Sequence, residues 1–143
     1  GQVLKAGNIS VTAHMTPGHT PGSTTWTWQS CDGAKCLDVV YADSVTAVSH
    51  DGFRYSGGWG APDISALFKA SIDKIGALKC DVLLSTHPGA SGLLEKRAAR
   101  TATSNPFINA GACRDFASRA QANLAARLAT EQGEKSAAVY SRD

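Results

Sequence analysis

The sequence predicts a layered α/β domain in which helices cover an outer face of a mostly antiparallel sheet. Segments with strand-like alternation come first, and helical segments separated by one short apolar strand follow them. The chain has 143 residues, 43% of them hydrophobic, which is enough for one domain with its own core. We therefore expect residues 1–143 to form a single unit.

Three segments of the first 45 residues are predicted to be strands. Residues 9–14 alternate apolar and polar side chains, which indicates a half-buried strand. Residues 24–29 alternate again and place Trp26 and Trp28 on one face, an arrangement typical of core packing. Residues 37–42 are more continuously apolar and should lie deeper. Turn residues separate the three segments, so neighbouring antiparallel strands are expected.

The middle of the chain predicts a loop followed by helices and one strand. Residues 50–61 contain four glycines and several aromatic residues, which indicates an exposed loop, with Trp59 near the rim of a pocket. Residues 62–78 begin with Pro-Asp and carry apolar side chains at helical spacing. Residues 81–85 predict a short buried strand, and residues 93–100 predict a brief helix.

The last third of the chain predicts one more helical region. We expect Asn105 and Pro106 to cap and open it. Beyond Gly133 the sequence is polar, which predicts a frayed end. The stripe predicted to face the core has spacings of three and four: Cys113, Phe116, Ala117, Ala120, Leu124 and Leu128.

Composition argues against several classes of partner. The net charge is +2 and no block of like charges occurs, so binding to nucleic acid or to an anionic membrane has no electrostatic support. No apolar run approaches the roughly 20 residues that span a bilayer. Residues 1–5 show no signal-peptide pattern.

Four cysteines allow three pairings if all are joined. Cys31 and Cys36 flank a turn-rich tetrad that can bring two strand ends within disulfide range, which favours their pairing. Cys80 and Cys113 would then join the start of an apolar strand to a helix. A zinc site built from the cysteines is the competing interpretation, but the usual CxxC pairs are absent.

Two histidines stand in stiff bends that follow strand-like segments. His19 lies between two Pro-Gly turns in residues 16–23, and His87 precedes Pro-Gly in residues 85–89. A ring held in this way can aim one nitrogen at a fixed point, as a metal ligand must. A lone histidine is more often a surface or core residue, but these flanking turns favour ligation. Because loops at one end of a sheet can converge, we predict that the two imidazoles face a common site.

Three motifs, in order along the chain, resemble a known family. They are TPGHTPGS at residues 16–23, YADS at residues 41–44 and STHPG at residues 85–89. Together they are similar to the C-terminal half of a metallo-β-lactamase of subclass B3. The resemblance implies an αββα sandwich made of two similar halves. An isolated half should expose the apolar sheet face that its partner covers.

The resemblance also implies roles for individual residues. His19 would bind one zinc and His87 the second, with two zinc ions per complete enzyme. Ser44 would lie beside the second zinc or the substrate carboxylate, and Thr46 would supply another hydroxyl to that carboxylate. None of these side chains is expected to be a nucleophile, because zinc-bound hydroxide attacks the β-lactam carbonyl in this family. From the residues alone, Ser44 could equally satisfy a local backbone group.

The chain departs from the family pattern in one respect. The HxHxDH motif that supplies the other zinc ligands does not occur, and His14 and His50 have no His or Asp at the required spacing, so both are interpreted as structural. A catalytic zinc normally has three protein ligands. We therefore expect this chain to be inactive without an N-terminal half that carries the motif.

The implied activity is zinc-dependent hydrolysis of β-lactam antibiotics. A glyoxalase II-like hydrolase of thioesters or lactones is one alternative, since a bridging Asp stands near Asp43 in such enzymes. That Asp aligns better with Ser44, and such enzymes often carry a further His where Ser23 stands, so the lactamase is favoured and Asp43 is expected to buttress the loop. A non-catalytic fragment that self-associates through its bare sheet face is the other alternative.

The resemblance implies a Cys80–Cys113 bridge as well. Disulfides persist in oxidising compartments, so a periplasmic or secreted location is expected.

Overall fold

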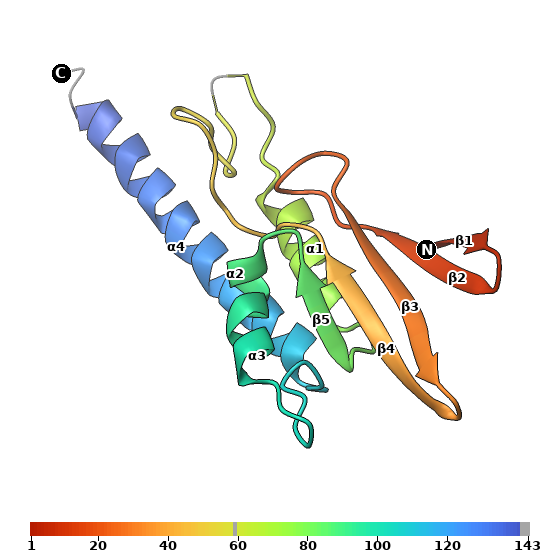
Figure 1. Cartoon of the computed structure of the whole chain (residues 1–143). Helices are drawn as coiled ribbons and strands as arrows, with labels where there is room; N and C mark the ends of the chain where they lie inside the picture. The colour runs from red at the N-terminus through yellow and green to blue at the C-terminus, as the bar shows by residue number, and fades with distance from the viewer. Residues whose placement is uncertain (59, 141–143) are drawn as a thin grey trace.

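The computed structural model describes residues 1–58 and 60–140, and the side chains of these except residues 6 and 134–140. Trp59, predicted to lie near a pocket rim, is therefore outside the described residues. One sheet has the strand order β1-β2-β3-β4-β5 (Figure 1). Its strands are β1 Gln2–Ala6, β2 Ile9–Met15, β3 Thr24–Asp32, β4 Lys35–Ala42 and β5 Val82–Ser85.

The strand pairing confirms the predicted antiparallel arrangement. Strands β1 to β4 pair with their sequence neighbours in antiparallel fashion, and β5 joins β4 in parallel. β1 was not predicted, because residues 2–6 have neither clear alternation nor a long apolar run. It pairs with β2 through a tight connection at Gly7, where φ is 62°.

The helices agree with the predicted segments except at two points. They are α1 Ser65–Gly76, α2 Pro88–Ser91, α3 Leu93–Ala99 and α4 Ala112–Tyr140. The unpredicted α2 begins with Pro88 at its first position, where a missing N–H costs nothing, and ends at Gly92 with φ of 64°. Within the described part of the chain, no helix is long and apolar enough to cross a membrane.

The predicted start of the last helix is wrong. Asn105 does not cap α4: its Oδ1 accepts the N–H of Phe107 at 3.2 Å, which closes a local turn. Ile108 then forms a bridge with Val82 at the edge of the sheet, and α4 begins only at Ala112. The helical backbone of α4 continues past Gly133 to Tyr140, and the fraying expected there stays a prediction about its mobility.

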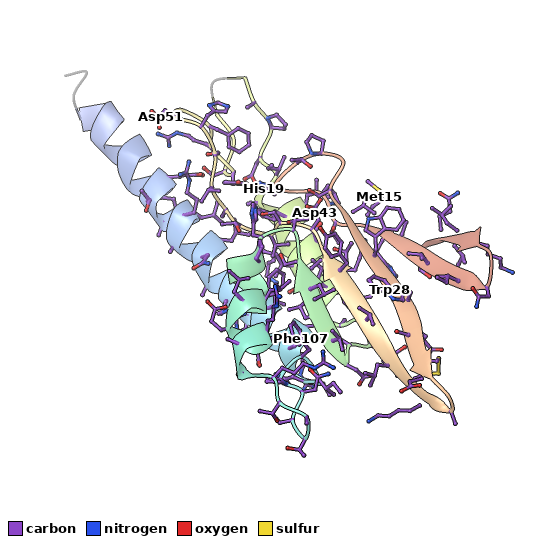
Figure 2. All side chains as sticks on the ribbon, in the orientation of Figure 1. Met15, His19, Trp28, Asp43, Asp51 and Phe107 are labelled. Carbon is purple, nitrogen blue, oxygen red and sulfur yellow. A yellow bond between two sulfur atoms is a disulfide. The ribbon has the colours of Figure 1, made fainter. Side chains whose placement is uncertain are left out.

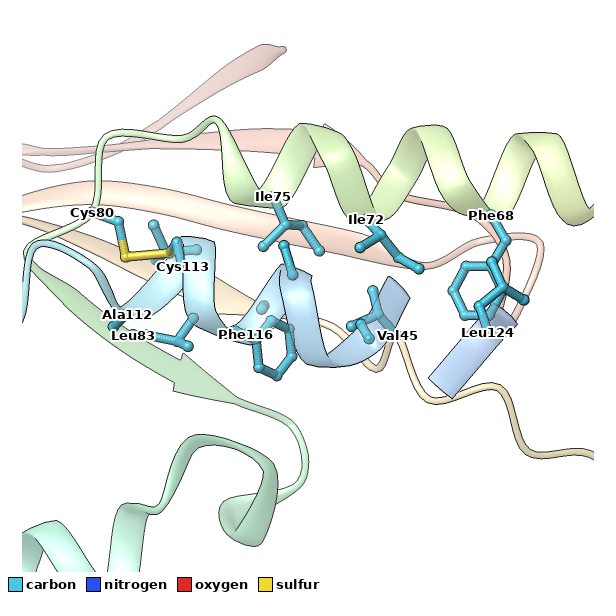
Figure 3. Packing of buried hydrophobic residues seen from close by; sticks show 14 of the residues in the cluster. Val45, Phe68, Ile72, Ile75, Cys80, Leu83, Ala112, Cys113, Phe116 and Leu124 are labelled. Atoms are coloured by element: carbon cyan, nitrogen blue, oxygen red, sulfur yellow. A yellow bond between two sulfur atoms is a disulfide. The ribbon is translucent and has the colours of Figure 1, made fainter. Parts of the chain in front are cut away.

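The core lies between one face of the sheet and the helices α1 and α4 (Figure 3). Val40 and Leu83 point into it from neighbouring strands and are 0% and 2% exposed. The predicted α4 stripe is buried there, with Leu128 partly buried against the cluster. The helices contribute the fully buried side chains Phe68, Ile72, Ile75 and Cys113.

The opposite face of the sheet is apolar and open. A shallow hollow of about 340 Å³ on this face is lined by Ile9, Val11, Trp26, Trp28 and Tyr41. The tryptophans are half-buried rather than packed in a core, which corrects the expectation from their alternation. No described helix packs on them, so the predicted exposure of an apolar sheet face is confirmed for the described residues.

Both expected disulfides are present. Cys31 and Cys36 are paired residues of the β3–β4 hairpin, and Cys80 joins the start of β5 to Cys113 of α4. Their Cα atoms lie 4.0 Å and 6.2 Å apart, respectively.

Removal of the Cys80–Cys113 bridge should lower the free energy of unfolding more than removal of the Cys31–Cys36 bridge. In the chain-entropy model, closing a loop with a sequence separation of 33 gives about 4 kcal/mol of stabilisation, and a separation of 5 gives about 2 kcal/mol. We expect urea unfolding to show a larger loss for Cys80→Ala/Cys113→Ala than for Cys31→Ala/Cys36→Ala. Equal losses would contradict this account.

A buried carboxylate fastens the loop before α1 to helix α4. Glu131 is 1% exposed, and its two oxygens accept the N–H groups of Tyr55 and Ser56 at 3.0 and 2.9 Å. Arg127, one turn earlier, forms an ion pair with Glu131 at 2.8 Å. Arg127 also donates to the carbonyl of Phe53 at 2.7 Å. We call this set, Glu131, Arg127 and residues 53–56, the α4 clamp.

The α4 clamp predicts acid sensitivity. Burial alone would raise the pKa of Glu131, but hydrogen bonds from Arg127, Ser56 and Tyr55 outweigh it and lower that pKa from 4.5 to about 2. The native state therefore binds this proton less readily than the unfolded chain does. Its contribution is present above pH 4.5 and is lost as the pH falls towards 2.

We expect urea unfolding to show up to about 3 kcal/mol of stability lost through this carboxyl across that interval. Glu131→Gln should show a correspondingly smaller loss on acidification. An unchanged pH dependence in that variant would refute the assignment.

Candidate metal centre

The loop between β2 and β3 holds His19 in a bend closed by its own hydrogen bonds. Thr16 N–H donates to the carbonyl of Ser23 at 2.9 Å, so the two ends of the loop are tied together. Gly18 N–H donates to the carbonyl of Thr20 at 3.1 Å, directly across His19. Thr20 and Ser23 hydroxyls lie 2.9 Å apart. The predicted stiffness of residues 16–23 therefore has a hydrogen-bonded basis.

Helix α1 supports this loop from the core side. A Cβ built on Gly18 would lie 2.0 Å from Cδ2 of Phe68, so the loop backbone rests directly on that ring. The φ of Gly18 is 152°, a conformation that side-chain-bearing residues rarely adopt. Ser71 of α1 donates its hydroxyl to the carbonyl of Pro17 at 2.6 Å. The loop that carries His19 thus rests on Phe68 and Ser71 of α1.

A carbonyl fixes the tautomer of the His19 ring. Nδ1 of His19 lies 2.9 Å from the carbonyl oxygen of Thr46. Because a carbonyl can only accept, Nδ1 carries the proton in this contact, and neutral His19 keeps its lone pair on Nε2. This is the arrangement in which an imidazole ligates a metal while its other nitrogen is held by an outer partner.

His87 reaches the same place from the end of β5. It occupies the position before α2 with extended backbone angles of −104° and 108°, and Pro88 starts the helix immediately after it. The rings of His19 and His87 lie 6.3 Å apart, centroid to centroid, in an edge-to-face orientation. The predicted meeting of two imidazoles separated by 68 positions is therefore found in the structure.

The end of β4 lies beside both histidines: Asp43 is close to His19 in Figure 2, and the N–H of Thr86, next to His87, donates to the carbonyl of Ala42 at 3.2 Å. Ser44 is 3% exposed, and its hydroxyl accepts the N–H of Thr46 at 3.3 Å. Asp43 accepts the N–H of Ser44 at 2.7 Å and that of Thr24 at 3.1 Å. Asp43 thus joins the start of β3 to the end of β4, which confirms its predicted role as a buttress.

The two imidazoles are the kind of ligand that zinc prefers, but they are too few to form a complete zinc site. Neutral imidazole nitrogens are ordinary zinc ligands, and one with its other nitrogen held by a carbonyl is well suited to the role. Among the side chains that the structure describes, those of residues 1–5, 7–58 and 60–133, no group of three or more His, Cys, Asp or Glu is placed to hold a metal ion. The described residues therefore supply at most part of a zinc site.

The other two histidines lie away from this centre. His14 hydrogen-bonds to Thr27 at 2.9 Å and lines a polar groove of about 820 Å³ on the sheet, which includes neither His19 nor His87. His50 is exposed, and its ring bonds to the carbonyl of Asp51 at 2.8 Å. The large groove is thus separate from the paired imidazoles, and the chemistry of the side chains identifies the latter as the candidate site.

Several solved structures are similar to this chain. No protein-family model matches the chain. Among solved structures, the Rm3 metallo-β-lactamase is 44% identical, with a TM-score of 0.86 over 92% of this chain and 49% of that chain. MEM-A1, a subclass B3 enzyme from a soil metagenome library, is 43% identical, with a TM-score of 0.87 over 94% and 51%. The metallo-β-lactamase SMB-1 is 40% identical, with a TM-score of 0.84 over 92% and 50%.

The sheet, the helices and the paired imidazoles at the strand ends define one half of a metallo-β-lactamase fold. More narrowly, the chain is similar to one half of a subclass B3 metallo-β-lactamase, as its motifs predict. It spans about half the length of the structures that it matches.

Proposed function

We propose that this chain supplies the C-terminal half of a di-zinc enzyme that hydrolyses β-lactam antibiotics. One observation carries the proposal: two imidazoles from distant motifs lie 6.3 Å apart, one with its tautomer fixed by a carbonyl. The metal ions of a two-metal site lie about 3.5–4 Å apart, so two such rings can each bind one ion of a pair. The lactamases that the chain matches agree with this choice of substrate.

In the proposed site, His19 and His87 hold one zinc each. Zinc supplies Lewis acidity and lowers the pKa of a bound water to about 7. The Thr46 carbonyl orients His19, and the α2 turn that begins at Pro88 orients His87. Ser44 and Thr46, at the end of β4, would receive the carboxylate of the substrate. The remaining zinc ligands come from polypeptide that carries the HxHxDH motif.

The same proposal assigns an occupant to the open sheet face. The N-terminal half of the enzyme would pack against Trp26, Trp28 and Tyr41. This packing would bring the zinc ligands of the N-terminal half to the ends of β4 and β5. Two disulfides favour an oxidising compartment, so we also propose a periplasmic or secreted location.

Complementation tests the function directly. The chain is mixed with a polypeptide carrying the N-terminal half, with and without zinc, and loss of a carbapenem absorbance band is followed. We expect hydrolysis only when both parts and zinc are present, and a chelator should abolish it. Turnover of a thioester without turnover of penicillins or carbapenems would replace the lactamase assignment with the glyoxalase II-like alternative.

A further inference from the structure

Glu131 lies in none of the three sequence motifs, but a series of contacts links it to His19. The α4 clamp seats Tyr55, whose N–H donates to Glu131 Oε1 at 3.0 Å and whose side chain is 1% exposed. From Tyr55, two separate contacts lead towards the imidazole.

The first contact runs through the core. The ring of Tyr55 stacks on that of Phe68, with centroids 5.3 Å apart and an angle of 24°. Phe68 in turn lies against Gly18, at a distance that leaves no room for a Cβ there. Because packed rings cannot be displaced singly, the place of Tyr55 helps to set the backbone next to His19.

The second contact runs through the chain that leaves β4. The hydroxyl of Tyr55 donates to the carbonyl of Val48 at 2.8 Å. Two residues before Val48, the Thr46 carbonyl accepts the Nδ1–H of His19 at 2.9 Å. Tyr55 therefore restrains the segment that holds the tautomer of His19.

We propose that Glu131 is a positioning residue for His19. By holding the backbone of Tyr55, it fixes both Phe68 and residues 46–48, and through them the direction of His19 Nε2. Glu131 does not contact His19, so its effect passes through Tyr55. The inference rests on the proposed function only in naming zinc as the partner of that nitrogen.

The experiment measures the tautomer of the His19 ring directly. Nitrogen NMR of the 143-residue chain distinguishes Nδ1–H from Nε2–H in a neutral imidazole ring. We expect one Nδ1–H form in the unmodified chain, and mixed tautomers in Glu131→Gln and in Tyr55→Phe. The second variant keeps the ring on Phe68 and removes only the bond to Val48. With the N-terminal half present, zinc affinity should fall about 10–100-fold in both variants.

Two control variants separate positioning from loss of stability. Asn123→Ala changes an exposed residue of the same helix and should leave the His19 signals unchanged. Ile75→Ala removes a fully buried side chain of α1 without touching the α4 clamp, and costs about 2–5 kcal/mol. It should also leave a single tautomer.

Unchanged His19 signals in Glu131→Gln would overturn the inference, whether or not zinc binds. Mixed tautomers in Ile75→Ala would overturn it too, because general destabilisation would then explain the effect. If the tautomers respond as expected but the unmodified complemented protein binds no zinc, positioning is supported and the proposed function fails.

Discussion

We expect replacement of His19 with glutamine to lower kcat/KM for a carbapenem by more than about 100-fold in the complemented enzyme. Removing an outer partner of a metal ligand already costs about 10–100-fold, so removing the proposed ligand itself should cost more. Glutamine keeps polarity and approximate length but offers no imidazole nitrogen. Zinc content should fall by about one ion per complex, because the resemblance places His19 and His87 on different ions.

A histidine outside the site provides the matched control. His50→Gln makes the same chemical change at an exposed position, where the ring bonds to the neighbouring carbonyl of Asp51 at 2.8 Å and lies edge-to-face against Phe53 at 5.8 Å. It should retain both zinc ions and full activity. If His19→Gln also retains both ions, His19 is not a ligand, and the assignment fails whatever the activity.

The convergence of the two histidines could be predicted because the local sequence carries the geometry. Pro-Gly turns on both sides of His19 and after His87 limit the backbone conformations, and each follows a recognisable strand. The sheet then brings the strand ends together. By contrast, the carbonyl that fixes His19 belongs to Thr46, 27 residues away, and no local pattern indicates such a bond.

The α4 clamp shows a signal that sequence reasoning passed over. Glu131 follows Leu124 and Leu128 with spacings of four and three, so it continues the apolar stripe of α4 as a carboxylate. A charge at a core position needs partners, which here include two amides from residues 75 and 76 positions away. The stripe could therefore have indicated a buried acid, but the identity of its partners depends on tertiary structure.

The predicted start of α4 is wrong because it, too, depends on a contact distant in sequence. Asn105 and Pro106 are typical of a helix start, yet the same side-chain oxygen can close a turn, as it does with Phe107. The bridge between Ile108 and Val82, two residues distant in sequence, decides between a helix start and a turn at Asn105. The local sequence allows both outcomes, and the contact at the sheet edge selects the turn.

The second large effect is expected at Gly18, where one methyl group should disturb both the core and the metal centre. In Gly18→Ala the new Cβ would meet the Phe68 ring at 2.0 Å, and the residue would have to keep a φ of 152°. Overpacking costs about 1–3 kcal/mol and a disfavoured backbone conformation about 1–3 kcal/mol, so we expect a loss near 4 kcal/mol in urea unfolding. Relaxation of the loop should displace His19 and weaken zinc binding in the complemented enzyme.

Gly22→Ala is the matched control, because it adds the same methyl group to the same loop where nothing lies within 4 Å. It should change stability by less than about 1 kcal/mol and leave zinc binding intact. Adding Phe68→Leu to Gly18→Ala makes space beneath the loop and should recover the overpacking part of the loss, while the backbone part persists. Equal losses in Gly18→Ala and Gly22→Ala would show that the loop does not rest on Phe68, and the structural link between α1 and His19 would then be absent.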